Sequence, residues 1–349
     1  LFTGNGAKSL SIRNSTERPI CTGEPALMPP DNPVTVRHRN AQRIFAEKFG
    51  IYEYRAETNG VEGICHTVML EKHVLPGELI LGNDSHTCHL GAANSLAVGK
   101  GASEFAAALL TGDIPIKVPE TIRIVLNGKL NNGITTTDAM LTIISSQDFK
   151  NNIASGRVLQ FGGNALEKIS VEDQTTFTNM SIEGQAFTGV VEPNEPLVQF
   201  MMSSHNMKRE QVLKMMVYPD TNAEYIKTIE IDLSSIEIMA AMPGDTQRGV
   251  SLNEVKDTKI DFFYIGSCKG ATLTALREAA QILKNRTIAN RVVFHIQAGS
   301  RTIEETAKKE GLFDIFEKAG AEIIGRGCGP CMGATSDAND REEAVLSDT

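Results

Sequence analysis

The stretch Phe262-Phe-Tyr-Ile-Gly-Ser-Cys-Lys-Gly270 decides the fold class, because a short apolar strand runs directly into a turn that carries a cysteine. Downstream, the apolar pattern predicts a helix at 273–284, a strand at 292–297, a helix at 303–310 and a strand at 321–324. Thr302 and Glu305 predict a capping box for the second of these helices. Because strand and helix alternate, we expect a parallel βαβ sheet and an α/β fold.

Two further cysteines lie in Gly327-Cys-Gly-Pro-Cys-Met-Gly333, after the last of these strands. Open α/β sheets place their ligand sites beyond the carboxyl ends of the strands, where both cysteine motifs fall. Three thiolates from Cys268, Cys328 and Cys331 suit an iron–sulfur cluster with one iron left without a protein ligand, and such an iron can act as a Lewis acid. The spacing alone also suits a zinc site completed by a histidine, or structural thiols beside a redox pair.

Composition sets the frame for these motifs. At 349 residues the chain is long enough for two or three domains of about 150 residues each. We expect three domains, which comprise residues 1–115, 116–252 and 253–349. The formal charge of −9 argues against nucleic acid as a partner, and no apolar run predicts a membrane span. The six cysteines indicate a reducing compartment rather than a disulfide scaffold, so we expect a cytoplasmic protein.

A second polar cluster follows a predicted strand at 79–81. Asp84, Ser85 and His86 are consecutive, and His66 lies upstream in Gly63-Ile-Cys-His66. An acid, a hydroxyl and an imidazole this close can serve proton transfer, although they also fit an ordinary polar turn. Small-residue helices are expected at 91–97 and 103–111.

Taken together, these segments resemble the aconitase and isopropylmalate dehydratase family. Seven motifs occur in the family's order between roughly residues 60 and 335: Gly63-Ile-Cys-His-Thr-Val, Pro76-Gly-Glu-Leu-Ile-Leu-Gly-Asn-Asp-Ser-His-Thr87, Gly99-Lys-Gly-Ala-Ser-Glu104, Lys117-Val-Pro-Glu-Thr121, Asn179-Met-Ser-Ile-Glu183, Ile265-Gly-Ser-Cys268 and Gly327-Cys-Gly-Pro-Cys-Met-Gly333. In its compact size, the chain is most similar to the separate large, cluster-bearing subunit of 3-isopropylmalate dehydratase.

The resemblance implies a three-domain aconitase-like core, with parallel-sheet domains around a central iron–sulfur cleft. It implies that Cys268, Cys328 and Cys331 hold a 4Fe-4S cluster, which Asn179 supports from outside the ligand set. The cluster's unligated iron would bind the carboxylate and hydroxyl of a hydroxy di- or tricarboxylic acid.

The same resemblance assigns the proton-transfer groups. It implies that Asp84 pairs with His66, that Glu183 pairs with His86, and that Ser85 hydrogen-bonds the substrate. The reaction is loss of water to an unsaturated acid and its re-addition, often with the hydroxyl moved by one carbon. A dehydratase of this kind would serve leucine biosynthesis.

Three departures from the family pattern affect these expectations. The family's upstream Asp-His pair aligns with Asp31-Asn32, with His38 as a substitute, and Lys269-Gly270 stands where the family has Thr-Asn. The family's arginine-rich loop and its swivelling domain, which carries the base serine, do not occur before Thr349.

We therefore expect a small swivel-domain subunit as partner, in a heterodimer or heterotetramer, and no turnover by this chain alone. The alternative is a catalytically degenerate cluster-binding or interaction protein of the same family.

Overall fold

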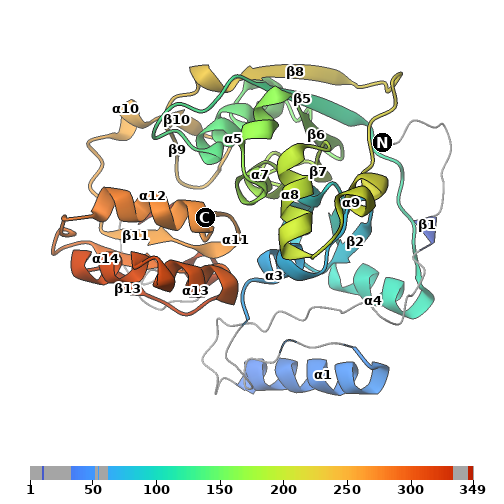
Figure 1. Cartoon of the computed structure of the whole chain (residues 1–349), viewed down its shortest axis with the longest axis horizontal. Helices are drawn as coiled ribbons and strands as arrows, with labels where there is room; N and C mark the ends of the chain where they lie inside the picture. The colour runs from blue at the N-terminus through green and yellow to red at the C-terminus, as the bar shows by residue number, and fades with distance from the viewer. Residues whose placement is uncertain (1–9, 12–32, 52–53, 55–61, 333–344, 349) are drawn as a thin grey trace. The chain divides into compact units, whose positions relative to one another are not determined.

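The computed structural model describes residues 10–11, 33–51, 54, 62–332 and 345–348. The chain divides into two compact units (Figure 1). The first comprises Leu1–Ser15 with Leu70–Asp257, and the second comprises Thr16–Met69 with Thr258–Thr349. The three domains with boundaries at 115 and 252 remain a prediction.

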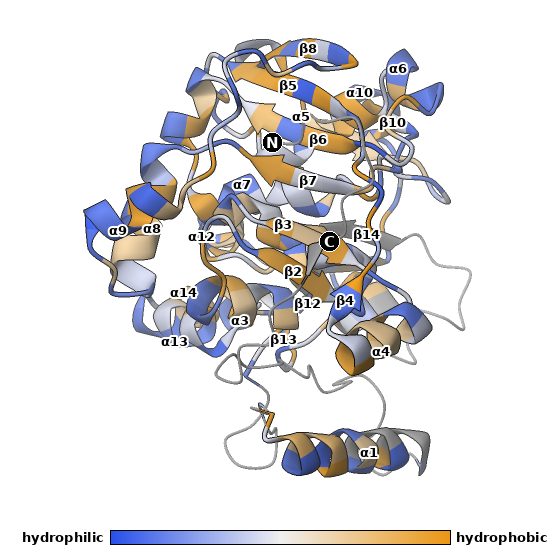
Figure 2. Ribbon diagram, turned by 90° about the vertical axis from the view of Figure 1, so that its right-hand side faces the viewer, coloured by the Kyte–Doolittle hydropathy of each residue, from blue (hydrophilic) through white to orange (hydrophobic). Residues whose placement is uncertain are grey.

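The first unit is organised by a four-stranded parallel sheet in the order β7-β6-β5-β8. Its strands are β5 (Thr121–Asn127), β6 (Val158–Gly162), β7 (Thr188–Val191) and β8 (Lys227–Asp232). Every second residue of β5 is buried, namely Ile122, Ile124 and Leu126, so one face of this strand lies in the core. Figure 2 shows hydrophobic residues along β5 and β6.

Helices connect these strands, as expected for parallel pairs. They are α5 (Thr136–Ile144), α6 (Gln147–Lys150), η2 (Asn164–Lys168), α7 (Val171–Asn179), α8 (Glu195–Ser204) and α9 (Arg209–Met215). Thr135 caps α5 through its side chain, which accepts a hydrogen bond from the backbone N–H of Asp138. After β8 come η3 (Leu233–Ser235), the antiparallel pair β9 (Met239–Ala241) and β10 (Gly249–Ser251), and α10 (Leu252–Val255).

A smaller parallel pair in the first unit carries the polar cluster. Its elements are β2 (Leu79–Gly82), the 3-10 helix η1 (Ser85–Ala93) and β3 (Leu96–Gly99). The helix predicted at 91–97 is therefore wrong, because the chain leaves η1 through a left-handed Asn94 and pairs with β2 as a strand. The helix predicted at 103–111 is confirmed as α4 (Ala102–Thr111), which ends at a left-handed Gly112. Next, β4 (Asp113–Ile114) pairs antiparallel with β1 (Leu10–Ser11).

The second unit contains the parallel sheet predicted from the opening stretch, in the order β13-β12-β11-β14. The strands are β11 (Phe262–Ile265), β12 (Val293–Ile296), β13 (Glu322–Ile323) and β14 (Val345–Asp348). The helices are α1 (Pro33–Phe49), α3 (Cys65–Lys72, which continues into the first unit), α11 (Ser267–Gly270), α12 (Leu273–Leu283), α13 (Arg301–Lys309), α14 (Leu312–Ala319) and η4 (Gly329–Met332).

The start of α13 differs from the prediction. The residue that caps it is Ser300, whose hydroxyl accepts from the N–H of Ile303, so Thr302 lies inside the helix rather than at its cap. The capping box predicted from Thr302 and Glu305 is therefore wrong. The chain enters from β12 through Gly299, and its extended backbone at Ser300 places that hydroxyl over the free N–H groups.

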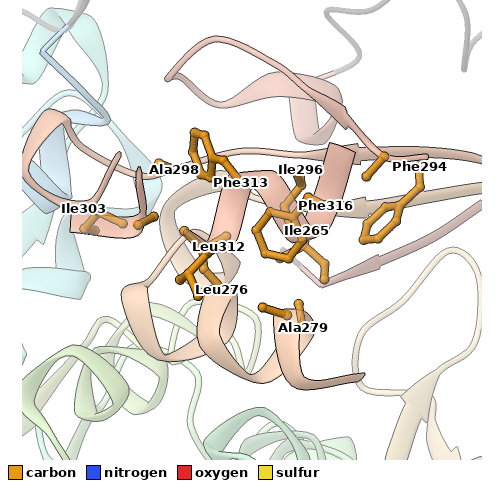
Figure 3. Close-up of a cluster of buried hydrophobic side chains, with 13 residues drawn as sticks. Ile265, Leu276, Ala279, Phe294, Ile296, Ala298, Ile303, Leu312, Phe313 and Phe316 are labelled. Atoms are coloured by element: carbon orange, nitrogen blue, oxygen red, sulfur yellow. The ribbon is translucent and has the colours of Figure 1, made fainter. Parts of the chain in front are cut away.

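The core of the second unit lies between its sheet and helices α12 to α14 (Figure 3). Leu276 and Phe316 are fully buried there, in one cluster with Ile296 of the inner strand β12. We expect Phe316→Ala to lower the free energy of unfolding by about 3–5 kcal/mol, because it removes a buried ring and leaves a cavity. Ile282→Ala on α12 is the control: that side chain is 61% exposed, so its change should stay within about 0.5 kcal/mol. Urea unfolding measures both, and equal losses would contradict this description of the core.

Among the described residues, no helix is both long and apolar enough to cross a membrane.

Candidate active site

His86 is placed by the turn that joins β2 to η1. Asp84 caps η1, and its carboxylate accepts a hydrogen bond from the His86 N–H at 2.7 Å. The Thr87 hydroxyl donates to the Asp84 carbonyl at 2.7 Å. Gly99 of β3 lies directly beneath this turn, because a Cβ there would collide with the same carbonyl oxygen. The neighbouring strand thus fixes the turn, and His86 follows it with a side chain that is 29% exposed.

His86 and Glu183 are in direct contact. The Nε2 atom of His86 lies 2.9 Å from Oε1 of Glu183, although the two residues are 97 positions apart in sequence. The His86–Glu183 contact expected from the family resemblance is confirmed. Its cause is the packing of α7 on η1: the Thr178 hydroxyl donates to the His89 carbonyl at 2.9 Å, and the Cys88 thiol lies 3.4 Å from the Asn179 carbonyl.

Further contacts hold both sides of this pair. Ser85 Oγ lies 3.4 Å from His86 Nδ1, so the two ring nitrogens face a hydroxyl and a carboxylate. The 245–247 loop supports Glu183: the Gln247 amide donates to its carbonyl at 3.2 Å, and the Thr246 hydroxyl lies 3.5 Å from Oε2. Sequence reasoning missed Thr246 and Gln247, because neither lies in a motif.

Two further residues that the family resemblance implied, Asn179 and His66, are both buried. Asn179 is buried, and its Nδ2 lies 3.2 Å from Nδ1 of His89. His66 is also buried, in the second unit, whereas Asp84 belongs to the first. The pairing of Asp84 with His66 and the support of a cluster by Asn179 remain predictions.

All three motif cysteines follow strands of one parallel sheet. Cys268 lies in α11, immediately after β11, and Cys328 and Cys331 lie in the segment after β13. None of the three forms a disulfide in the described part of the chain; Cys331 is exposed and the other two are partly buried. The expected position of both motifs beyond strand carboxyl ends is confirmed.

The donor set fits an iron–sulfur cluster in its chemistry. Among the residues that the structure describes, no group of three or more His, Cys, Asp or Glu side chains is arranged to hold a single metal ion. Ligands of one zinc ion must all reach the same atom at about 2.0–2.3 Å. The thiolates of a four-iron cluster bind different irons, so they can lie further apart. Three cysteine side chains at the same end of one sheet are donors of the type that an iron–sulfur cluster takes.

A buried tyrosine lies beneath these cysteines. Tyr264 of β11 is fully buried, and burial together with the nearby Cys331, Cys328 and Cys268 raises the pKa of its phenol. Its hydroxyl therefore remains protonated and acts as a donor. Sequence analysis treated Tyr264 only as part of an apolar strand.

Comparison with known proteins identifies the family. The model of the aconitase family (aconitate hydratase) matches residues 38–259 and 251–349. The chain belongs to the aconitase family. It is 35% identical to the methanogen homoaconitase large subunit of Methanocaldococcus jannaschii, over 91% of this chain and 76% of that protein. It is 39% identical to the 3-isopropylmalate dehydratase large subunit 1 of Pyrococcus furiosus, over 83% of this chain and 67% of that protein.

Two departures from the aconitase family pattern, the Asp31-Asn32 segment and Lys269-Gly270, concern residues proposed to lie at or near the site. Asp31 and Asn32 lie outside the described residues, and nothing is described of the His38 side chain. Lys269, which replaces the usual threonine, is 95% buried next to Cys268. The lysine therefore adds a buried polar side chain beside the cysteine loop.

Proposed function

We propose that this chain is the large subunit of a hydro-lyase that uses a 4Fe-4S cluster to dehydrate and rehydrate a hydroxy di- or tricarboxylic acid. The observation that carries the proposal is the placement of Cys268, Cys328 and Cys331 beyond the strands of one parallel sheet in a member of the aconitase family. These three residues would hold the cluster. When bound, it would supply a Lewis acid that draws charge from the hydroxyl and carboxylate of the substrate.

Side chains of this chain would transfer the protons that the reaction requires. Loss of water removes a proton from carbon and returns one to the departing hydroxyl, so the site needs a group that can hold and release a proton. A hydrogen bond from His86 Nε2–H to Glu183 at 2.9 Å would keep the proton on Nε2 and leave Nδ1 toward Ser85. Nδ1 of His86 would then exchange protons, and the Ser85 hydroxyl would orient the substrate. We propose that Asp84 serves His66 in the same way.

The substrate class rests on the relatives. Relatives of this chain are named homoaconitase or 3-isopropylmalate dehydratase large subunits, and these names guide our choice of substrate. Isopropylmalate is our first choice and a homocitrate-type acid the second. The words "large subunit" in these names support a small swivel-domain subunit as the partner, which would complete the clamp on the distant carboxylates. A role in leucine biosynthesis follows from the first choice.

Activity of the reconstituted complex tests the proposal. We expect the anaerobically reconstituted chain together with the small subunit of the same organism to convert isopropylmalate into an unsaturated acid. Each component alone should give no measurable turnover, because positioning both ends of the acid requires both surfaces. Ultraviolet absorbance of the double bond measures the reaction, and homocitrate is assayed in parallel.

The control is a complex built on Glu322→Gln, a change at an exposed residue of β13 whose carboxylate contacts His295 rather than a proposed catalytic residue. A complex that holds iron and sulfide in equal amounts yet converts neither acid would overturn the enzyme proposal. That result would favour a cluster-binding protein without catalysis.

A further inference from the structure

The two cysteine loops of the second unit share one buried polar connection. In the sheet order β13-β12-β11-β14, Cys268 follows β11, and Cys328 and Cys331 come after β13. The strand between them, β12, ends at Ile296, so Gln297 is the first residue beyond it. Gln297 is 1% exposed. Its side chain therefore lies between the segments that carry the cysteines.

Tyr264 and Gln297 bind each other and both loops. The Tyr264 hydroxyl donates to Gln297 Oε1 at 2.5 Å, and it lies 3.4 Å from the backbone carbonyl of Cys328. The same Oε1 lies 3.4 Å from the backbone N–H of Ser267, next to Cys268. The Gln297 amide donates to the carbonyl of Gly325, three residues before Cys328. The polar atoms of this pair are thus turned to the backbone beside the thiols.

Two glycines allow the backbone to pass close to the Tyr264 side chain. A Cβ at Gly266 would collide with the Tyr264 ring and hydroxyl, and a Cβ at Gly329 would lie 2.5 Å from that hydroxyl. Ser267 has φ +64°, a left-handed conformation that few non-glycine residues adopt. Its N–H points to Gln297, which helps to keep the Cys268 turn in this conformation.

We propose that Tyr264 and Gln297 are positioning residues that set the arrangement of the three cysteine thiols before a cluster binds. This inference rests on the proposed cluster site. The Tyr264 hydroxyl holds the Gln297 side chain, which in turn binds the backbone N–H of Ser267 and the backbone carbonyl of Gly325, one beside each cysteine loop. Supporting hydrogen bonds of this kind orient metal ligands. Loops that are already ordered lose less conformational freedom when the cluster forms.

The test compares Tyr264→Phe with Tyr225→Phe. Tyr225 makes a matched pair in the first unit, because its hydroxyl accepts a hydrogen bond from the Gln160 amide at 2.9 Å. In the full-length, cluster-free chain we expect Tyr264→Phe to speed amide hydrogen exchange in segments 266–271 and 325–332, with the rest of the chain unchanged. In the reconstituted chain, iron release to a chelator should become about 10- to 100-fold faster. Tyr225→Phe should alter neither measurement.

A second variant guards against misfolding. Gln297→Leu leaves the tyrosine ring in place and removes the bridge, so it should give the same local exchange pattern, and the double variant should add little to either single change. Unchanged exchange and iron release in both variants would overturn the inference, as would faster exchange spread over the whole second unit. If the wild-type chain takes up no iron and sulfide, the proposed function fails, whereas the exchange measured on the cluster-free chain still tests the positioning role.

Discussion

Serine in place of Cys268, Cys328 or Cys331 is expected to abolish cluster binding by the reconstituted chain. A serine hydroxyl is a poor ligand for iron compared with a thiolate, and a cluster held by three protein ligands has none to spare. The wild-type chain should bind iron and inorganic sulfide in near-equal amounts under anaerobic conditions and lose them in air. Metal and sulfide analysis, together with the visible absorbance of the cluster, measures each variant.

The controls are the cysteines outside the two motifs. Cys65 is partly buried and Cys88 is buried, and serine at either position should leave the iron and sulfide content unchanged. Cys21, which lies outside the described residues, should also be dispensable. Stoichiometric zinc without sulfide in the anaerobic wild-type protein would contradict the cluster assignment and restore the zinc alternative.

His86→Ala and Glu183→Gln should each lower turnover of the assembled complex by about 10²- to 10⁴-fold, the usual contribution of a proton-transfer group. The double variant should cost little more than either single change, because the two side chains form one hydrogen-bonded unit at 2.9 Å. Steady-state kinetics measures turnover, and iron analysis should show an intact cluster in all three variants.

The matched control is the second histidine–carboxylate contact, in which His295 Nε2 lies 3.1 Å from Glu322. Glu322→Gln removes the carboxylate charge from that pair and changes no proposed catalytic residue, so its turnover should match that of the wild type. Fully additive losses for His86 and Glu183, or loss of the cluster in either variant, would argue against a shared proton-transfer role.

Local sequence patterns determined much of the second unit. Apolar runs at 262–265 and 292–297, separated by a helix-forming segment, become the parallel strands β11 and β12 because each run buries its side chains against α12 to α14. The cysteine motifs could also be placed beyond strand ends, since short loops keep these residues close to the strands they follow. At 91–97 this reasoning failed, because small apolar residues suit a buried strand as well as a helix, and pairing with β2 decided between them.

Tertiary packing alone decided the contacts that join distant residues. Glu183 carries no signal beyond its place in the family motif Asn179-Met-Ser-Ile-Glu183, and it meets His86 because α7 packs on η1. Tyr264 and Gln297 look like ordinary residues of two strands, yet the parallel register of β11 and β12 brings their side chains to one end of the sheet. The sequence by itself determined which residue types and local elements could form the site. Which side chains meet depends on the packing of whole elements, because hydrogen bonds act over a few ångströms and local patterns carry no information about residues 30 to 100 positions away.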